Sequence, residues 1–374
     1  MGARGAVSYA AEMQSRRQFL RDTAALPLSA AMAPGLARQP ASLPKVLILA
    51  TGGTIAATGA SSTDLSNYRS AALLGEQVLN SVPQVKQYAD VTVEQLLNIA
   101  SYDLTLDGWL TLAKRINRIF RDDKQLAGIV VTHGTSTLEE TAYFLNPTVK
   151  DTRPVVLVGS MRPATAISAD GPLNLLNAVR TAIAAESRGK GVLVVMNDEI
   201  NAARDVTKTN TFRVETFRSP DVGVLGYINE DRVTFYRSPS RRHTAGSEFD
   251  VDALSSLPKV EILYSYLEPD TDGLHDVIRR GARGVVFAGS GPGSLPESYK
   301  AAIRQARRAA PGRAPAFVIA SRVGSGRVIP RTEYTDLGMV PADNLNPQKA
   351  RILLMLALTQ TTDAEVIARL FREY

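Results

Sequence analysis

The distribution of apolar residues along the chain predicts where strands and helices lie. Four continuous apolar runs are typical of parallel strands covered on both faces: Lys45–Ala50, Ala127–Thr132, Pro154–Gly159 and Gly191–Met196. Between them, three segments with helical apolar periodicity predict helices: Leu106–Phe120, Thr137–Phe144 and Pro172–Ala185. This alternation of strand and helix predicts an open parallel sheet of the α/β class.

The same rhythm resumes after an interruption. Residues 231–253 are rich in charge, Pro, Gly and Ser and predict a linker. Beyond it come three predicted strands and three predicted helices: Val260–Tyr264, Gly284–Ala288 and Ala316–Ala320, then Pro296–Ala309, Pro347–Thr359 and Asp363–Arg372. We therefore expect two α/β domains, an N-terminal one over residues 44–230 and a smaller C-terminal one over residues 254–374.

Residues 1–40 have the pattern of an export signal. The run Ser15-Arg16-Arg17-Gln18-Phe19-Leu20-Arg21 precedes a mildly apolar stretch of small residues from Ala24 to Ala37. This resembles a bacterial twin-arginine signal, with Ala33 or Ala37 as candidate cleavage points. The alternative is a basic tail in which two arginines are adjacent by chance. Export to the periplasm also fits a chain that has no cysteine.

Composition excludes several classes of protein. The 374 residues are 44% hydrophobic and 21% charged, as in a globular protein with a large core. No apolar run reaches the roughly 18–20 residues of a membrane span, so we expect no membrane partner. The absence of cysteine excludes a thiolate zinc site, and three dispersed histidines disfavour a histidine metal site. Half of the net charge of +6 lies in residues 1–40, where five arginines face two acids, so nucleic-acid binding has little support.

Candidate chemistry gathers after the predicted strands of the first domain, where open parallel sheets bind ligands. Hydroxyls, glycines and one lysine follow these strands: Thr51-Gly52-Gly53-Thr54, Thr132-His133-Gly134-Thr135-Ser136-Thr137, Ser160-Met161-Arg162-Pro163 and Arg204-Asp205-Val206-Thr207-Lys208. Glycines let backbone N–H groups approach a ligand, as an oxyanion hole requires. Without cysteine, a covalent mechanism would use Ser or Thr, activated by Lys, Tyr, a carboxylate or water.

Each of these elements also has a purely structural interpretation. Thr135, Ser136 and Thr137 precede two glutamates and match a helix N-cap. The Thr51–Thr54 segment matches a simple turn, Lys208 a surface lysine, and His133 a hydrogen-bonded core histidine. The run Gly289-Ser-Gly291-Pro-Gly293 lacks the spacing of a dinucleotide-binding fingerprint.

Taken together, however, the segments resemble one family, the bacterial type II L-asparaginases and glutaminase-asparaginases. The resemblance is carried by Ala50–Ala56, Thr132–Glu140, Met161–Pro172, Val194–Asp198, Arg204–Asn210 and Leu345–Arg351, and it covers the chain beyond residue 43. It implies a flavodoxin-like N-terminal domain, a smaller C-terminal α/β domain, and hydrolysis of L-asparagine, with L-glutamine as a further substrate. It also implies a periplasmic homotetramer of two close dimers, active sites shared between paired subunits, and no metal or organic cofactor.

The resemblance assigns roles residue by residue. Thr54 resembles the nucleophile, and Tyr68 the tyrosine that assists it. Thr135 and Lys208 resemble a second hydroxyl and the lysine that orders it. Ser101 resembles the residue that holds the α-carboxylate of the substrate.

Four positions qualify the resemblance. Tyr102 stands where the family has Gln, Ser136 where it has Asp, and Ser294 where it has an Asn contributed by the partner chain. Glu333 is our best counterpart of the family's C-terminal Glu. In the family, the Gln, Asp and Glu receive the α-ammonium of the substrate, and two of these three are replaced. Three hypotheses therefore stay open: an asparagine hydrolase, a hydrolase of a related amide without a free α-amine, and a periplasmic amide-binding protein with weakened turnover.

Overall fold

The structure is a computed structural model that describes residues 42–312 and 314–374. The predicted export signal lies outside the described residues. In the part of the chain that the structure describes, no helix is long and apolar enough to cross a membrane.

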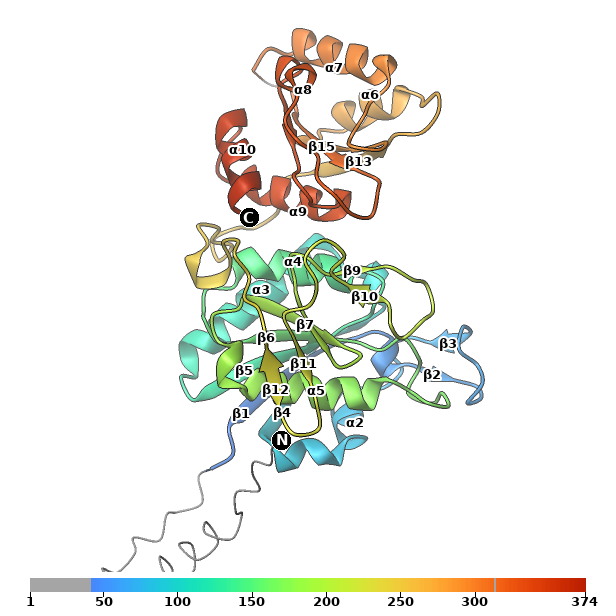
Figure 1. Ribbon diagram of the computed structural model, residues 1–374, viewed down its shortest axis with the longest axis vertical. Helices are drawn as coiled ribbons and strands as arrows, with labels where there is room; N and C mark the ends of the chain where they lie inside the picture. Colours follow the sequence, from blue (N-terminus) through green and yellow to red (C-terminus); the bar gives the residue numbers. More distant parts are fainter. Residues whose placement is uncertain (1–41, 313) are drawn as a thin grey trace, which may run out of the picture. The chain divides into compact units, whose positions relative to one another are not determined.

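The N-terminal region is built on an eight-stranded sheet in the order β12-β11-β8-β7-β6-β5-β1-β4 (Figure 1). Its strands are β1 (Lys45–Gly52), β4 (Asp90–Ile99), β5 (Leu126–Thr132), β6 (Val155–Val158), β7 (Val192–Met196), β8 (Glu199–Ala202), β11 (Gly226–Ile228) and β12 (Val233–Phe235). The five strands β4, β1, β5, β6 and β7 are parallel, and β8, β11 and β12 extend the sheet antiparallel. The predicted parallel α/β sheet is confirmed, with an antiparallel edge added to it.

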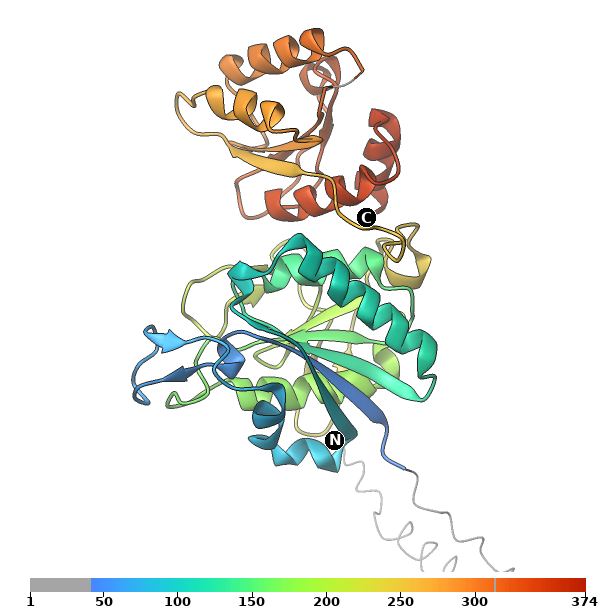
Figure 2. The same ribbon diagram turned by 180° about the vertical axis from the view of Figure 1, so that it is seen from behind.

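Helices cover both faces of this sheet (Figures 1 and 2). One hydrophobic cluster joins one face to α2 (Gly75–Asn80) and α5 (Gly171–Ile183). A second joins the other face to α3 (Leu106–Asp122) and α4 (Leu138–Thr148). Since successive side chains of a strand point to opposite faces, this double coverage explains why the central parts of β1, β5, β6 and β7 are continuously apolar.

The order of the parallel strands creates a switch point beside β1. The chain passes from β1 to β4 on one side and then returns to β5 on the other side. This is the flavodoxin-like order, and ligands in such sheets bind outside the carboxyl ends of the strands at the switch point. The segments that follow Gly52 and Thr132 therefore begin at the position where a binding crevice is expected.

Two small antiparallel ribbons lie outside the main sheet. One pairs β2 (Thr58–Gly59) with β3 (Tyr68–Arg69), and the other pairs β9 (Thr207–Lys208) with β10 (Phe217–Arg218). These ribbons carry two of the predicted site residues, Tyr68 and Lys208.

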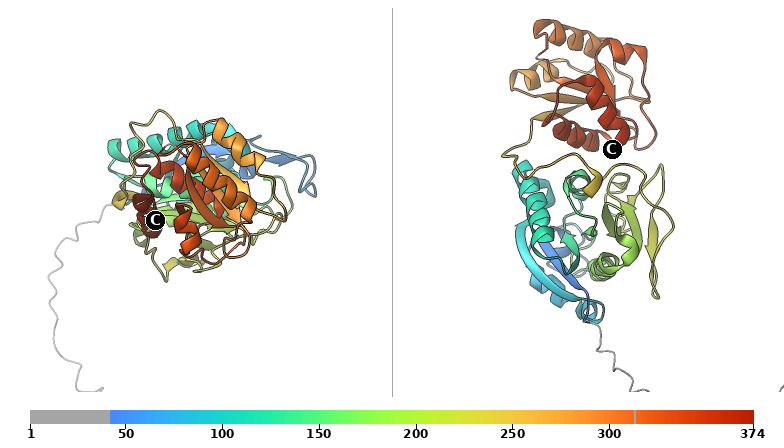
Figure 3. Two further views of the ribbon diagram at one scale, coloured as in Figure 1. Left: turned by 90° about the horizontal axis from the view of Figure 1, so that it is seen from above. Right: turned by 90° about the vertical axis from the view of Figure 1, so that its left-hand side faces the viewer.

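The C-terminal region has its own four-stranded sheet (Figure 3), and all neighbouring strands in it are parallel. In sheet order, which is also chain order, the strands are β13 (Val260–Tyr264), β14 (Gly284–Gly289), β15 (Ala316–Ser321) and β16 (Met339–Pro341). Its helices are α6 (Asp272–Arg279), α7 (Glu297–Ala309), α8 (Thr332–Asp336), α9 (Pro347–Ala357) and α10 (Ala364–Glu373). The predicted smaller C-terminal α/β domain is confirmed as a fold.

Helix α9 connects the two regions. It packs against β13, β14 and β15 and also against α4. Its fully buried Lys349 donates hydrogen bonds to the backbone carbonyls of Ala203, Arg204 and Val206 in the N-terminal region. Within the segment predicted as a linker, residues 231–253, β12 belongs to the large sheet, and a 3-10 turn follows at Thr244–Gly246.

Candidate active site

Three loops meet beyond the carboxyl ends of β1, β4 and β5, and two glycines allow the meeting. Gly53 has φ +84°, and a Cβ on it would lie 2.3 Å from the Cα of Gly134. A Cβ on Gly134 would in turn lie 2.7 Å from the Ser101 Oγ. No other residue type has the small size that these contacts require. The backbones therefore touch, and Thr54, Ser101 and Thr135 come together.

Thr54 begins a 3-10 turn directly after β1 and its side chain is buried. Its hydroxyl lies 3.2 Å from the hydroxyl of Tyr68, close enough for a hydrogen bond in either direction. Tyr68 is held in place by the short β2–β3 ribbon, where it pairs with Gly59. The predicted pair of a threonine and an assisting tyrosine is thus present as a geometric pair.

A second hydroxyl is paired with the lysine. The Lys208 Nζ donates a hydrogen bond of 2.9 Å to the Thr135 Oγ1. Burial lowers the pKa of Lys208, while the negative charge of Glu139 opposes that shift. A lysine with a lowered pKa gives up a proton more readily, which suits it to guide proton transfer at the adjacent hydroxyl.

Glu139 holds this arrangement in place, although the sequence singled it out only as part of a helix start. One of its carboxylate oxygens accepts a 3.0 Å hydrogen bond from the Lys208 backbone N–H. The other accepts a 2.7 Å hydrogen bond from the Gln348 side chain on α9. The helix-cap interpretation of the preceding hydroxyls is not what the structure shows, because Thr137 makes no side-chain cap and donates instead to the Ser101 carbonyl.

A cavity of about 280 Å³ contains the groups just described. Seven predicted residues line it: Thr54, Tyr68, Ser101, Tyr102, Thr135, Ser136 and Lys208. Met161, from the candidate segment Ser160–Pro163, also lines it, together with side chains that the sequence did not single out: Leu65, Ser66, Ser70, Ala100, Thr211 and Phe212. Most of the latter lie in loops with no periodic pattern, so no local signal points to them. Lys208 carries the only formal charge of the cavity lining in the described part of the chain.

Two predicted residues lie away from this cavity. Ser294 closes a tight turn after β14, where its backbone exchanges hydrogen bonds with Ser290. Glu333 forms a 2.6 Å ion pair with Lys300, and this hydrogen bond holds the pKa of Glu333 below its ordinary value. A contribution of either residue to the site of a partner chain stays a prediction.

His133 is a core histidine, as its structural interpretation proposed. Its ring is buried, its Nδ1–H donates to the Gly134 carbonyl, and its Nε2 lies 3.0 Å from the Thr141 hydroxyl. Trp109 extends this series of hydrogen bonds by donating its indole N–H to the Thr141 oxygen. Burial lowers the pKa of His133 to about 4, so a neutral imidazole supports the loop that carries Thr135.

In the described ranges, no group of three or more His, Cys, Asp or Glu side chains is arranged to hold a metal ion. The fold and the cavity define a flavodoxin-like α/β protein whose candidate reacting groups are hydroxyls beside one tyrosine and one lysine.

Comparison with known proteins identifies the family. Residues 45–241 match the family model described as "Asparaginase, N-terminal", and residues 259–371 match "Glutaminase/Asparaginase C-terminal domain". The chain belongs to the asparaginase family of amidohydrolases, and the predicted resemblance is confirmed.

Curated relatives and a solved structure agree with this assignment. The chain is 46% identical to L-asparaginase 2 of Escherichia coli over 359 residues, which cover 96% of this chain and all of the relative. It is also 46% identical to the "Probable L-asparaginase periplasmic" of Haemophilus influenzae, over 89% of this chain and 94% of the relative. A probable cytoplasmic L-asparaginase from Campylobacter jejuni has a crystal structure that matches with a TM-score of 0.83 and 44% identity, covering 88% of this chain and 99% of that chain.

Proposed function

We propose that this protein hydrolyses L-asparagine to L-aspartate and ammonia, with Thr54 as the nucleophile. The observation that carries the proposal is the convergence of two hydroxyl pairs, Thr54 with Tyr68 and Thr135 with Lys208, on one small cavity at the switch point of the sheet. The names of the relatives supply the substrate, and the description of the matched C-terminal model adds glutamine as a second amide to test.

In the first step, the Thr54 oxygen attacks the amide carbon of the substrate. The Thr54 proton passes to Tyr68, whose own proton goes to the leaving nitrogen. The carbon–nitrogen bond then breaks, ammonia leaves, and an ester links the substrate acyl group to Thr54. Backbone N–H groups of the two glycine loops stabilise the negative oxygen that forms during the attack.

In the second step, water replaces Thr54 on the acyl carbon. The hydroxyl of Thr135 accepts a proton from this water as it attacks and passes its own proton to the unprotonated form of Lys208, which the lowered pKa of that lysine makes accessible. The ester bond breaks, Thr54 regains a proton, and the free acid leaves. Ser101 binds the α-carboxylate of the substrate in this proposal, which its burial beside Gly134 at the cavity supports.

Ammonia release from a panel of amides tests this function. The panel contains L-asparagine, L-glutamine and succinamate, and purified full-length protein is used. We expect ammonia from asparagine at steady state. A thermal shift on addition of asparagine without any ammonia would instead support the amide-binding hypothesis and would refute turnover.

One observation favours a second candidate substrate class, amides that lack a free α-amine. In the described chain, no carboxylate lines the cavity; Tyr102 and Ser136 offer only neutral hydroxyls, and Glu333 is paired with Lys300. A charge-assisted hydrogen bond to an ammonium contributes roughly 1.5–3 kcal/mol when it is well placed. We therefore propose that asparagine is selected less strongly than an amine-free analogue such as succinamate.

We further propose a homotetramer of two close dimers, with Ser294 and Glu333 of one chain next to the cavity of its partner. The resemblance stated from the sequence motivates this assembly. Light scattering on the active protein tests it, because a fully active monomer would contradict it.

We also propose export to the periplasm through the twin-arginine-type signal of residues 1–40. The name of the Haemophilus influenzae relative supports this location, while that of the Campylobacter jejuni protein points to the cytoplasm. Fractionation of cells that express the wild type or an Arg16→Lys, Arg17→Lys variant tests the signal. The variant is expected to stay in the cytoplasm.

A further inference from the structure

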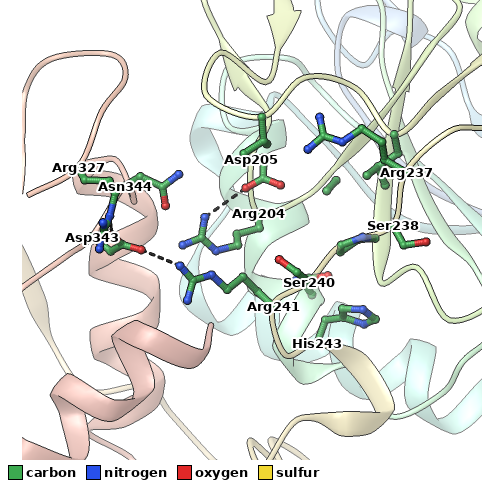
Figure 4. A pocket seen from close by; sticks show the side chains of 15 residues that line it. Arg204, Asp205, Arg237, Ser238, Ser240, Arg241, His243, Arg327, Asp343 and Asn344 are labelled. Carbon is green, nitrogen blue, oxygen red and sulfur yellow. Dashed lines mark hydrogen bonds and ion pairs between the residues drawn. The ribbon is translucent and has the colours of Figure 1, made fainter.

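A second cavity, of about 420 Å³, shares no residue with the cavity that holds Thr54 (Figure 4). Its walls come from the segment after β8, from residues 237–243 of the predicted linker, and from two C-terminal loops that contain Arg327 and Asp343. The sequence of residues 237–243 predicts only a linker, and the proposed reaction uses none of these side chains.

The lining is rich in arginine. Four guanidinium groups, those of Arg204, Arg237, Arg241 and Arg327, face only two carboxylates, those of Asp205 and Asp343. The cavity lining therefore carries a net of two positive charges. Burial lowers the pKa of His243, which also lines the cavity, and so favours its neutral form.

The two carboxylates do not saturate the four arginines. Asp343 is shared between Arg241, at 2.8 Å, and Arg327. Asp205 lies 3.2 Å from Arg204. Among the described residues Arg237 forms no ion pair, and its side chain is exposed at the edge of the cavity. The positive charge of Arg237 is therefore left without a paired carboxylate in the described part of the chain.

Arg204 forms one wall of the cavity. Only 7% of its side-chain surface is exposed. Its Nε donates to the main-chain oxygen of Tyr374 and its Nη1 donates to Asp205, so these hydrogen bonds fix the guanidinium in the wall of the cavity.

We propose that this cavity is a binding site for a small oxyanion with two negative charges, a dicarboxylate or a phosphate. Planar guanidinium groups bind carboxylate and phosphate oxygens in pairs, which suits arginine to this class of ligand. The net charge of two matches a dianion, and the hydroxyls of Ser238 and Ser240 on the same wall supply further donors. The volume accommodates a molecule of a few carbon atoms.

The site lies on the backbone that leads to the candidate active site. Arg204 and Asp205 precede Lys208 by a few residues, and Lys349 holds the carbonyls of Ala203, Arg204 and Val206. A bound dianion would therefore add contacts to a segment that already positions Lys208.

Calorimetric titration at low salt tests the proposal on the full chain. Succinate and inorganic phosphate are the two dianionic probes, and neutral succinamide is the uncharged control. We expect one dianion per chain with a Kd of about 1 mM or tighter. Stronger binding of succinate identifies a dicarboxylate site, and stronger binding of phosphate identifies a phosphate site. Equal binding of succinamide, or no binding of either dianion below about 10 mM, would overturn the proposal.

Variants locate the binding. Arg241→Gln should weaken the dianion at least tenfold, and Arg237→Gln, which removes an exposed side chain without an ion pair, about fivefold. Arg232→Gln, an equivalent charge change on a side chain that is 73% exposed and outside the cavity, should change binding less than twofold.

Lys208→Met separates the two cavities, because it removes the only charge of the first one. Binding kept in Lys208→Met and weakened in Arg237→Gln supports the proposal. Binding lost in Lys208→Met and kept in both arginine variants would place the anion beside Thr54 and refute the proposal. Thermal unfolding checks that each variant is folded. If Arg241→Gln does not fold, Arg237→Gln alone provides the test.

Discussion

The two sheets of this protein place a glycine-rich loop after a buried parallel strand, yet only one of those loops leads into a cavity lined by hydroxyls. At the end of β1, Gly52 lies against Ile99, the last residue of β4, Gly53 lies against Gly134 in the loop that follows β5, and Thr54 faces Tyr68. After β14, the loop folds back on itself through the Ser290–Ser294 bridge, and apolar side chains surround Gly293.

Strand order explains the difference. In the large sheet the chain leaves β1 on one side and returns on the other, so neighbouring loops diverge and leave a crevice. In the C-terminal sheet β13, β14, β15 and β16 follow one another in chain order, so no switch point arises. Glycine after a strand is therefore not sufficient for a site, and the topology decides whether groups from several loops converge.

The largest expected effect comes from Thr54→Ala. We expect hydrolysis to fall by about 10⁴-fold or more, because the nucleophile is removed. Steady-state ammonia release measures the loss. The matched control is Thr181→Ala, which truncates another buried threonine on α5, where its hydroxyl donates to the Asn177 carbonyl. If Thr54→Ala kept a tenth of wild-type turnover, Thr54 would not be the nucleophile.

Lys208→Met should lower kcat by about 10³-fold, since the Thr135 hydroxyl loses the group that orders it. Members of one catalytic unit are not additive, so Thr135→Ala combined with Lys208→Met should lose little more than either change alone. Single-turnover kinetics on the three variants measures this. If the fold losses in kcat of the two single variants multiplied in the double variant, Thr135 and Lys208 would have separate roles.

A pair of glycine substitutions tests the loops themselves. Gly53→Ala places a Cβ 2.3 Å from the Gly134 backbone at a positive φ, and we expect it to lower the free energy of unfolding by about 3 kcal/mol or more. Gly291→Ala, in the C-terminal loop at φ +50°, meets nothing within 4 Å and should cost only about 1 kcal/mol. Urea unfolding compares the two. Equal losses in the free energy of unfolding would mean that the close contact between the loops does not contribute to stability.

Ser136→Asp sharpens the proposal on substrate class. A carboxylate at the edge of the cavity should raise kcat/KM for asparagine by about ten- to a hundredfold, or about 1.4–2.7 kcal/mol, and lower it for succinamate. Ser61→Asp adds the same charge on an exposed residue outside the cavity and should change neither value much. The idea is wrong if the wild type already has micromolar affinity for asparagine and the substitution raises kcat/KM less than about threefold.

The smallest effect concerns pH. The pKa of His133 in the folded state is about 4, below its ordinary value of 6.5, so the unfolded chain takes up the proton first as pH falls. The contribution of the neutral His133 to the free energy of unfolding is therefore present above pH 6.5 and is lost as pH falls from there toward 4. Between pH 7.5 and 5.5 we expect His133 to account for about 1 kcal/mol of lost stability. Urea unfolding at both pH values should show a smaller loss for His133→Gln, and an unchanged loss would contradict this.

Some of the fold could be predicted because local pattern and tertiary environment agree. The buried runs at β1, β5, β6 and β7 are continuously apolar except for a lysine or threonine at the ends of β1 and β5, a pattern that strands covered on both faces favour. Strand β4 was missed because it lies at the edge of the sheet, where half-buried and exposed residues mix and the run is not continuous. Strands β8, β11 and β12 are short and antiparallel and carry no comparable signal.

The sequence by itself determined the α/β class, the residue types available for chemistry, and the family. Motifs specify those properties locally, through apolar runs, glycines and hydroxyls in a defined order. Only the tertiary structure decided which of these groups meet. The contacts of Thr54 with Tyr68 and of Lys208 with Thr135, the positioning role of Glu139, and the arginine-lined cavity all join residues far apart in the chain or on ribbons with no periodic pattern. Such contacts depend on strand order and backbone packing, which local sequence does not encode.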